Sequence, residues 1–257
     1  MVEAVHASTA GEPVSAVGVG APGPLDHLGG VIHEAPNLPG FIEVAVARDM
    51  SARLGVPVFL DRDVFVAALA EATFGAARGV RDWVYITIST GIGGAIVTDG
   101  KLLRGVSGTA GEIGHVPIDP NGPRCGCGNI GDIEALAGGA NIAKHYGVAS
   151  AAEVFAAWRR GDERARGIVE RAQRALGDMG VLLVNLLNPK RIVVGGGIAT
   201  GEPEFVFGAM RTAVRERAFT VPGAAVEIVP AALGDDVGLV GSALMARERV
   251  AGRQPLG

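Results

Sequence analysis

The segment from residue 111 to residue 134 carries the densest group of side chains that could bind a metal or a ligand. Within 18 residues it holds a histidine, two cysteines that one residue separates, and an aspartate. Zinc accepts imidazole nitrogen, thiolate sulfur and carboxylate oxygen, so these side chains are an acceptable set of four ligands. The predicted metal site consists of His115, Cys125, Cys127 and Asp132. The alternative interpretation is a glycine-rich surface loop with free thiols.

Two glycine clusters each follow a predicted strand, one over 84–88 and one over 191–194. Glycines let main-chain N–H groups approach anionic oxygens, and a threonine can add its hydroxyl. Neither cluster matches the P-loop or the G-x-G-x-x-G pattern before a helix, which disfavours a dinucleotide-binding fold. Two such clusters favour a nucleotide site, although a glycine-rich hairpin corner has the same pattern. The residues are Thr90, Gly91, Gly93 and Gly94 in the first cluster, and Gly195, Gly196 and Gly197 in the second.

Asp63 lies at the end of a strand predicted over 56–60 and directly before a helix predicted over 64–74. A carboxylate in that place is well positioned to act as a general base. Aspartate is also a favoured N-cap residue, which is the alternative interpretation.

The remaining apolar pattern predicts strands that alternate with helices, which is typical of the α/β class. We expect an irregular segment over 105–131 and a final helix that begins near Asp235 and Asp236, whose carboxylates suit an N-cap. The other predicted elements are a strand over 14–20, a hairpin of 95–98 and 101–103 across an Asp-Gly turn, helices over 132–146, over 151–187 with a break near Gly161, and over 203–218, and a strand over 225–229.

Composition excludes several classes of protein. The 257 residues have a net charge of -4 and show no basic stripe, which argues against a nucleic-acid partner. No apolar run is long enough to span a bilayer, so no membrane association is expected. The N-terminus lacks the pattern of a signal peptide. The two cysteines are too close in sequence for a structural disulfide, which favours a metal or reduced thiols in the cytoplasm.

Taken together and in this order, the motifs resemble those of the ROK family of sugar kinases and sugar-responsive repressors. The most specific part is G-E-I-G-H at 111–115, followed by C-x-C-G-x-x-G-x-x-E, which ends at Glu134. The other matching segments are 18–26, 35–40, Asp63 with 67–71, 90–94, 188–189 before 195–197, and 233–236.

The resemblance implies an actin-like ATPase fold, related to ribonuclease H, with two α/β domains and a cleft between them. The expected small domain is 1–80 plus 236–257, and the large domain is 81–235. ATP phosphates would meet the loop from Thr90 to Gly94, with the adenosine end near Gly195 to Gly197, and Mg²⁺ would neutralise the phosphates. Asp63 would be the base, and zinc would be structural. The resemblance also suggests a homodimer or homotetramer. The sugar would be held by Asn37, Asp63, Glu112, His115 and Glu134.

Three departures from the family pattern affect these expectations. Family members usually open with a D-x-G-G-T hairpin, and no such motif occurs before residue 14. Without the strands of that hairpin, the predicted strands at 16–20 and 58–60 would have an open edge. The residue before the base is usually Asn, but here it is Arg62, which could pair with Asp61 or Asp63, reach a ligand, or point into solvent. Pairing with Asp63 would lower the pKa of the base. Asp132 stands where a third zinc cysteine is usual, which should weaken the site.

The first functional hypothesis is an ATP-dependent, glucokinase-like kinase of a hexose or an N-acetylhexosamine. The alternatives are a degenerate or truncated relative that binds sugar without efficient turnover, and a sugar-responsive transcriptional regulator. A regulator would need a DNA-binding segment, and the basic surface that grips phosphates is absent from this sequence.

Overall fold

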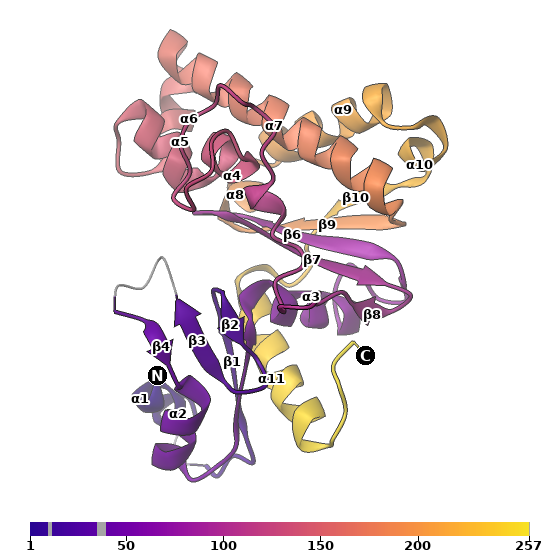
Figure 1. Ribbon diagram of the computed structural model, residues 1–257. Helices are drawn as coiled ribbons and strands as arrows, with labels where there is room; N and C mark the ends of the chain where they lie inside the picture. Colours follow the sequence, from indigo (N-terminus) through magenta and orange to yellow (C-terminus); the bar gives the residue numbers. More distant parts are fainter. Residues whose placement is uncertain (10–11, 35–39, 257) are drawn as a thin grey trace.

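The computed structural model describes residues 1–9, 12–34 and 40–256, and within these ranges the strands form three sheets (Figure 1). The predicted sugar-binding residue Asn37 lies outside the described residues. No helix among the described residues has the length and apolar character needed to cross a bilayer.

The largest sheet has five strands in the order β10-β9-β6-β7-β8. β6 is parallel to β9 and antiparallel to β7, and β9 is parallel to β10. Alternate residues of β6 enter two different cores, Ile86 on one face and Tyr85 on the other, which explains the continuous apolar run of this strand. The strands are β6 (Trp83–Ile88), β7 (Ile92–Thr98), β8 (Lys101–Leu102), β9 (Arg191–Gly195) and β10 (Glu227–Pro230).

Helices cover both faces of this sheet (Figure 1). One face packs against a helical layer built on α7 (Glu163–Leu187), whose first turn is capped by Asp162 accepting from the Ala165 N–H at 2.8 Å. The other face packs against α3 (Asp63–Thr73), which in turn contacts α11 (Val237–Val250). The helical layer comprises α4 (Ile133–Ala137), α5 (Gly139–Tyr146), α6 (Ala151–Arg159), α7 (Glu163–Leu187), α8 (Gly197–Gly201), α9 (Ala209–Arg217) and α10 (Thr220–Ala225).

The first part of the chain forms the two smaller sheets. β1 (Val17–Ala21) pairs in parallel with β5 (Val58–Arg62), and these are the only two strands of their sheet among the described residues. The predicted open edge of β1 is therefore present in the described part of the chain. The other elements are α1 (Val2–Thr9), α2 (Val46–Leu54) and the antiparallel strands β2 (Leu25–Asp26), β3 (Val31–Glu34) and β4 (Ile42–Val44).

The helix predicted over 132–146 is two helices, because the chain breaks at Gly138. The Gly139 N–H donates to the Ser89 carbonyl at 2.9 Å, so α5 begins against the tip of the β6–β7 hairpin. A Cβ at Gly138 would lie 2.8 Å from the Glu134 carbonyl oxygen, which leaves room for glycine alone at this bend. Three other predictions are confirmed. They are the helix break near Gly161, the hairpin turn at Asp99 and Gly100, and the irregular segment over 105–131.

Three helix starts also differ from the predictions. Asp63 is the first residue of α3, and Arg62 occupies the N-cap position, so the N-cap interpretation of Asp63 is wrong. Asp236 occupies the N-cap position of α11, but its side chain makes no capping hydrogen bond and a 3₁₀ turn over Gly234–Asp236 comes first. The helix predicted over 203–218 begins with a π-helical turn, Glu204–Gly208.

The two-domain division at residues 80 and 236 stays a prediction. α3, which falls in the predicted small domain, packs through Val64 and Phe65 onto the five-stranded sheet of the predicted large domain. The functional residues before and after residue 80 can therefore meet at this contact.

Candidate functional site

A cavity of about 690 Å³ lies where α3, the β6–β7 hairpin and the segment after residue 111 come together. It brings together four of the residues predicted for the sugar site: Asp63, Glu112, His115 and Glu134. Three residues of the first glycine cluster line the same space. The complete lining is Pro22, Gly23, Arg62, Asp63, Val64, Thr87, Ser89, Thr90, Gly91, Ile92, Gly93, Glu112, His115, Gly126, Cys127 and Glu134.

Asp63 lies at the start of α3 and opens onto this cavity. One of its carboxylate oxygens accepts from the Val64 N–H at 2.7 Å, which orients the side chain. Desolvation by the walls of the cavity raises the pKa of Asp63, and Glu112 acts in the same direction, whereas the Val64 N–H and the Arg62 charge oppose them. A carboxyl group with a raised pKa in a cavity is suited to accept a proton from a ligand.

Arg62 neither points into solvent nor pairs through its side chain with Asp61 or Asp63, so these predictions are wrong. The residue is 4% exposed, and its guanidinium donates to the Glu112 carboxylate at 2.5 Å and to the Ala110 carbonyl at 2.9 Å. The guanidinium carbon also lies 4.6 Å from the centre of the Phe65 ring. The pKa of Asp63 is raised overall rather than lowered, because the Arg62 charge is a lesser influence on it than desolvation.

Glu134 reaches the cavity from the first turn of α4 and contacts the hairpin tip. Its carboxylate accepts from the Ile92 N–H at 2.7 Å. A Cβ at Gly91 would lie 2.4 Å from that carboxylate, and one at Gly93 would lie 2.9 Å from the Val64 side chain. The glycines of the hairpin therefore let the Glu134 and Val64 side chains approach the backbone closely, in addition to any role in ligand binding.

The second glycine cluster leaves the same edge of the sheet as the first. β6 and β9 are parallel neighbours, with Thr87 paired to Gly195, so both clusters follow the carboxyl ends of adjacent strands. Gly196 has a φ of +95°, and a Cβ there would lie 2.5 Å from the Ile88 carbonyl oxygen. Parallel strands of α/β sheets commonly bind ligands at this edge. Gly195 to Gly197 do not line the cavity that contains Asp63.

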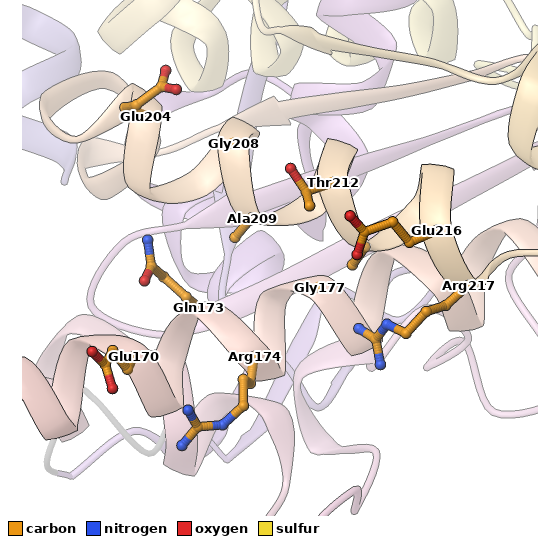
Figure 2. Close-up of a pocket in the computed structure, with 11 residues that line it drawn as sticks. Glu170, Gln173, Arg174, Gly177, Glu204, Gly208, Ala209, Thr212, Glu216 and Arg217 are labelled. Carbon is orange, nitrogen blue, oxygen red and sulfur yellow. The ribbon is translucent and has the colours of Figure 1, made fainter.

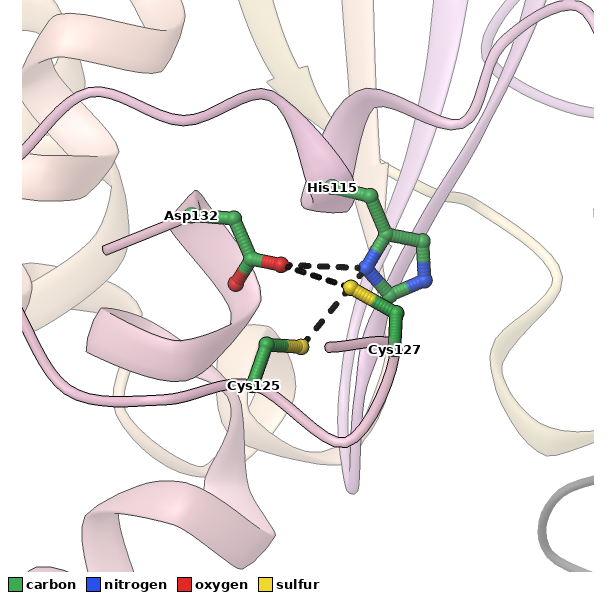
Figure 3. A group of neighbouring side chains, drawn as sticks. All are labelled: His115, Cys125, Cys127 and Asp132. Carbon is green, nitrogen blue, oxygen red and sulfur yellow. Dashed lines mark hydrogen bonds and ion pairs between the residues drawn. The ribbon is translucent and has the colours of Figure 1, made fainter. Parts of the chain in front are cut away.

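The four predicted metal ligands converge on one point (Figure 3). Their donor atoms all lie within 4.8 Å of one another. His115 Nδ1 is 3.3 Å from the Asp132 carboxylate, and Cys127 Sγ is 3.2 Å from it. Zinc bonds of about 2.0–2.3 Å in a tetrahedron require ligand separations of roughly 3.3–3.8 Å. These two distances, and the 3.8 Å between Cys125 Sγ and His115 Nδ1, lie in or near that range, so the donor set suits a zinc ion.

Asp132 has two functions in this arrangement. One of its oxygens faces His115 and Cys127, while the other accepts from the Ala135 N–H at 2.7 Å and caps α4. The pKa of Asp132 is lowered: burial opposes the shift, but hydrogen bonds from the thiols and from Ala135 favour the carboxylate. Burial raises the pKa of the Cys125 thiol to about 12. The group that could hold a metal is thus joined directly to the helix that carries Glu134.

Several features of the site are not predicted by the sequence analysis. These are the pairing of Arg62 with Glu112, and the place of Thr87 and Ser89 in the lining of the cavity. The position of Thr87 and Ser89 at a strand end next to the glycine cluster is a signal that could have indicated them. No pattern in the sequence indicates the pairing of Arg62, because 50 residues separate the partners.

A second hollow, of about 540 Å³, lies between α7 and α9 on the helical layer (Figure 2). Close contact of Gly177 with the Ala213 side chain lets the two helices run side by side. Glu170, Arg174 and Glu216 are among the charged side chains around it. None of the predicted site residues lines this hollow, so it is separate from the candidate site.

Comparison with known proteins agrees with the fold and the motifs. The chain is 34% identical to the glucokinase of Thermotoga maritima over 94% of this chain and 82% of that protein. The structure of a ROK hexokinase from Thermus thermophilus matches over 98% of this chain and 85% of the hexokinase chain, with 37% identity and a TM-score of 0.81. A ROK family glucokinase from Streptomyces griseus was solved in complex with glucose and AMPPNP. Its structure matches over 96% of this chain and 87% of the glucokinase chain, with 30% identity and a TM-score of 0.81.

These likenesses confirm the predicted actin-like ATPase fold. The model of the ROK family matches residues 1–249, which includes every motif on which the resemblance depends. The chain belongs to the ROK family.

Proposed function

We propose that this chain transfers the γ-phosphoryl group of ATP to a hydroxyl of a neutral hexose, with Asp63 as the general base. That the chain is an ATP-dependent sugar kinase follows from its family and from its glucokinase relatives. The observation that carries the assignment of the base is the position of Asp63, which lies in one cavity with Glu112, His115, Glu134 and the glycine hairpin.

Proton transfer is the part of the reaction that Asp63 can perform. The sugar hydroxyl must lose its proton as its oxygen attacks phosphorus, and a carboxylate within hydrogen-bonding reach can accept it. The Val64 N–H holds one Asp63 oxygen, which keeps the other available to the ligand. The raised pKa of Asp63 makes it a better proton acceptor than an ordinary aspartate.

The sugar would be bound by side chains that accept or donate hydrogen bonds around Asp63. Glu112 and Glu134 can accept from sugar hydroxyls, and His115 can donate or accept through the ring nitrogen that does not face Asp132. Asn37 is proposed for the same site on the resemblance alone.

The phosphates of ATP would lie at the hairpin tip from Thr90 to Gly94, and its adenosine end near Gly195 to Gly197. Support comes from the parallel arrangement of β6 and β9, which directs both clusters to one edge of the sheet. Mg²⁺ would arrive bound to the ATP phosphates and balance their charge.

We also propose a structural zinc ion held by His115, Cys125, Cys127 and Asp132. The spacing of their donor atoms and the mixture of nitrogen, sulfur and oxygen ligands suit zinc. The ion would fix the irregular segment that carries Glu112 and the start of α4, and it would take no part in the transfer step.

The direct test is an assay of sugar-dependent ADP release with glucose, mannose and N-acetylmannosamine. We expect at least one of these sugars to stimulate ADP release by the wild-type chain. Binding of a sugar in calorimetry without ADP release would contradict kinase activity and favour a degenerate relative that only binds sugar. Absence of both binding and turnover would contradict the sugar site itself.

A further inference from the structure

The side chain of Arg62 forms part of the wall of the cavity that contains Asp63. It extends from the end of β5 to the segment after residue 104, where it meets Glu112 and the Ala110 carbonyl. The Arg62 side chain is 5% exposed and the Glu112 side chain 39% exposed. The pair therefore joins a buried cation to a carboxylate that still faces the cavity.

A second pair beside it offers a comparison. Arg104 donates to both oxygens of Asp61, and its guanidinium carbon lies 5.1 Å from the centre of the same Phe65 ring that Arg62 contacts. Arg104 and Asp61 therefore also join β5 to the segment after β8, but neither residue lines the cavity. The two arginines have similar structural surroundings, and only Arg62 reaches the site.

The pairing of Arg62 has consequences for both partners. A buried arginine stays charged, so it needs a carboxylate to offset its lost hydration. Glu112 in turn is held in one orientation, and among the described residues only one of its two oxygens has a hydrogen-bond partner. The other oxygen remains available to a hydroxyl donor.

The pairing also sets the charge of the cavity. Arg62 is the sole lysine or arginine among the described lining residues, and its charge is offset by Glu112. The carboxyl groups of Asp63 and Glu134 then give the proposed sugar-binding part of the cavity a net negative charge. A sugar that carries a carboxylate would be repelled by these groups, whereas neutral hydroxyls would find acceptors.

We propose that Arg62 is a positioning and specificity residue, which aims Glu112 at a sugar hydroxyl and makes the site select neutral sugars over sugar acids. This inference rests on the proposed sugar-kinase function. The residue acts on the sugar through Glu112 and not on the transferred phosphoryl group, so its loss should change binding far more than turnover.

Calorimetric measurement of the sugar Kd in Arg62→Gln and Arg62→Lys tests the positioning role. The sugar used is whichever of glucose, mannose and N-acetylmannosamine binds the wild-type chain most tightly. Loss of one charged hydrogen bond predicts a rise in sugar Kd of about 10- to 100-fold for Arg62→Gln. Arg62→Lys keeps the charge and should recover part of this loss. The KM for the sugar should follow Kd, while kcat changes less than about threefold.

Arg104→Gln is the matched control, because it removes the neighbouring arginine that joins the same two segments. We expect both glutamine variants to lower the melting temperature, but Arg104→Gln to leave the sugar Kd within about threefold of wild type. An unchanged Kd in Arg62→Gln, or an equal loss in Arg104→Gln, would overturn the positioning role. If the wild-type chain binds sugar but releases no ADP, and Arg62→Gln still weakens sugar binding more than Arg104→Gln does, then the kinase function is refuted and the positioning role of Arg62 stands.

Glucuronate tests the charge argument. The wild-type chain should bind glucose more tightly than glucuronate, and Glu112→Gln should reduce that preference by about tenfold or more, because it leaves Arg62 free to attract a carboxylate. An unchanged preference in Glu112→Gln would refute the role of the pair in excluding sugar acids.

Discussion

Opposing influences act on the carboxyl group of Asp63. Desolvation by the cavity walls favours its protonated form, while the Val64 N–H and the Arg62 charge favour the carboxylate. Since the first of these is the largest, the pKa lies above the ordinary value of 3.8. At the scale of single residues, burial therefore dominates the pKa of the proposed base, and the Val64 N–H and the Arg62 charge oppose it.

This balance predicts the pH dependence of the reaction. A general base works when ionised, so kcat/KM should fall with decreasing pH through a pKa above 3.8. Arg62→Gln removes an influence that lowers this pKa, so its acid limb should shift to higher pH. Profiles of kcat/KM from about pH 4 to 9 measure both effects. An acid limb that shifts to lower pH in Arg62→Gln would contradict this account.

The sequence predicted the residue types of the site better than their pairings. Asp63, Glu112, His115 and Glu134 were singled out and do line one cavity. The pairing of Arg62 with Glu112 could not be predicted, because it depends on how the end of β5 meets a segment that lies 50 residues later. Local patterns carry no information on such distant contacts.

At the scale of elements, the hairpin between β6 and β7 is the feature that places Glu134. The Ile92 N–H holds the Glu134 carboxylate, and Gly139 and Ala140 at the start of α5 donate to the hairpin carbonyls. Gly138 separates α4 from α5 so that both can contact the hairpin tip. The predicted single helix over 132–146 was wrong because helical periodicity continues through this bend.

Gly91→Ala tests the role of this close contact. The new methyl group would lie 2.4 Å from the Glu134 carboxylate, so the carboxylate must move away from the Ile92 N–H. We expect the sugar Kd to rise about tenfold, as for a lost charged hydrogen bond, with little change in melting temperature. Gly167→Ala on α7 is the control, since a Cβ there meets nothing within 4 Å. Equal sugar affinity in the two variants would refute the contact's role.

At the scale of the whole molecule, three segments distant in sequence meet beside the five-stranded sheet (Figure 1). They are α3, the hairpin between β6 and β7, and the segment after residue 111. The α/β class, most strands and the irregular segment could be predicted, because apolar periodicity and turn residues are local signals. The separation of the N-terminal strands into two small sheets could not, since strand pairing is set by tertiary packing. The homodimer or homotetramer suggested by the resemblance stays a prediction.

Metal removal tests how the irregular segment is held in the folded chain. Elemental analysis should find close to one zinc per chain, and chelation should lower the melting temperature because the ion binds the folded state. Cys127→Ser should reproduce most of this loss. Asp132→Ala should lose a further ~1 kcal/mol, because it also removes the cap of α4. Less than about a tenth of an equivalent of metal in the native protein would contradict the zinc site.

In the proposed reaction, Asp63 removes the proton from the sugar hydroxyl during phosphoryl transfer. The most direct measurement compares sugar-dependent ADP release by the wild-type chain and Asp63→Asn, with sugar affinity measured by calorimetry on both. We expect kcat of Asp63→Asn to fall by about 10²- to 10⁴-fold, the usual contribution of a general base, with the sugar Kd within about tenfold of wild type. A variant that binds the sugar and retains wild-type kcat would contradict it.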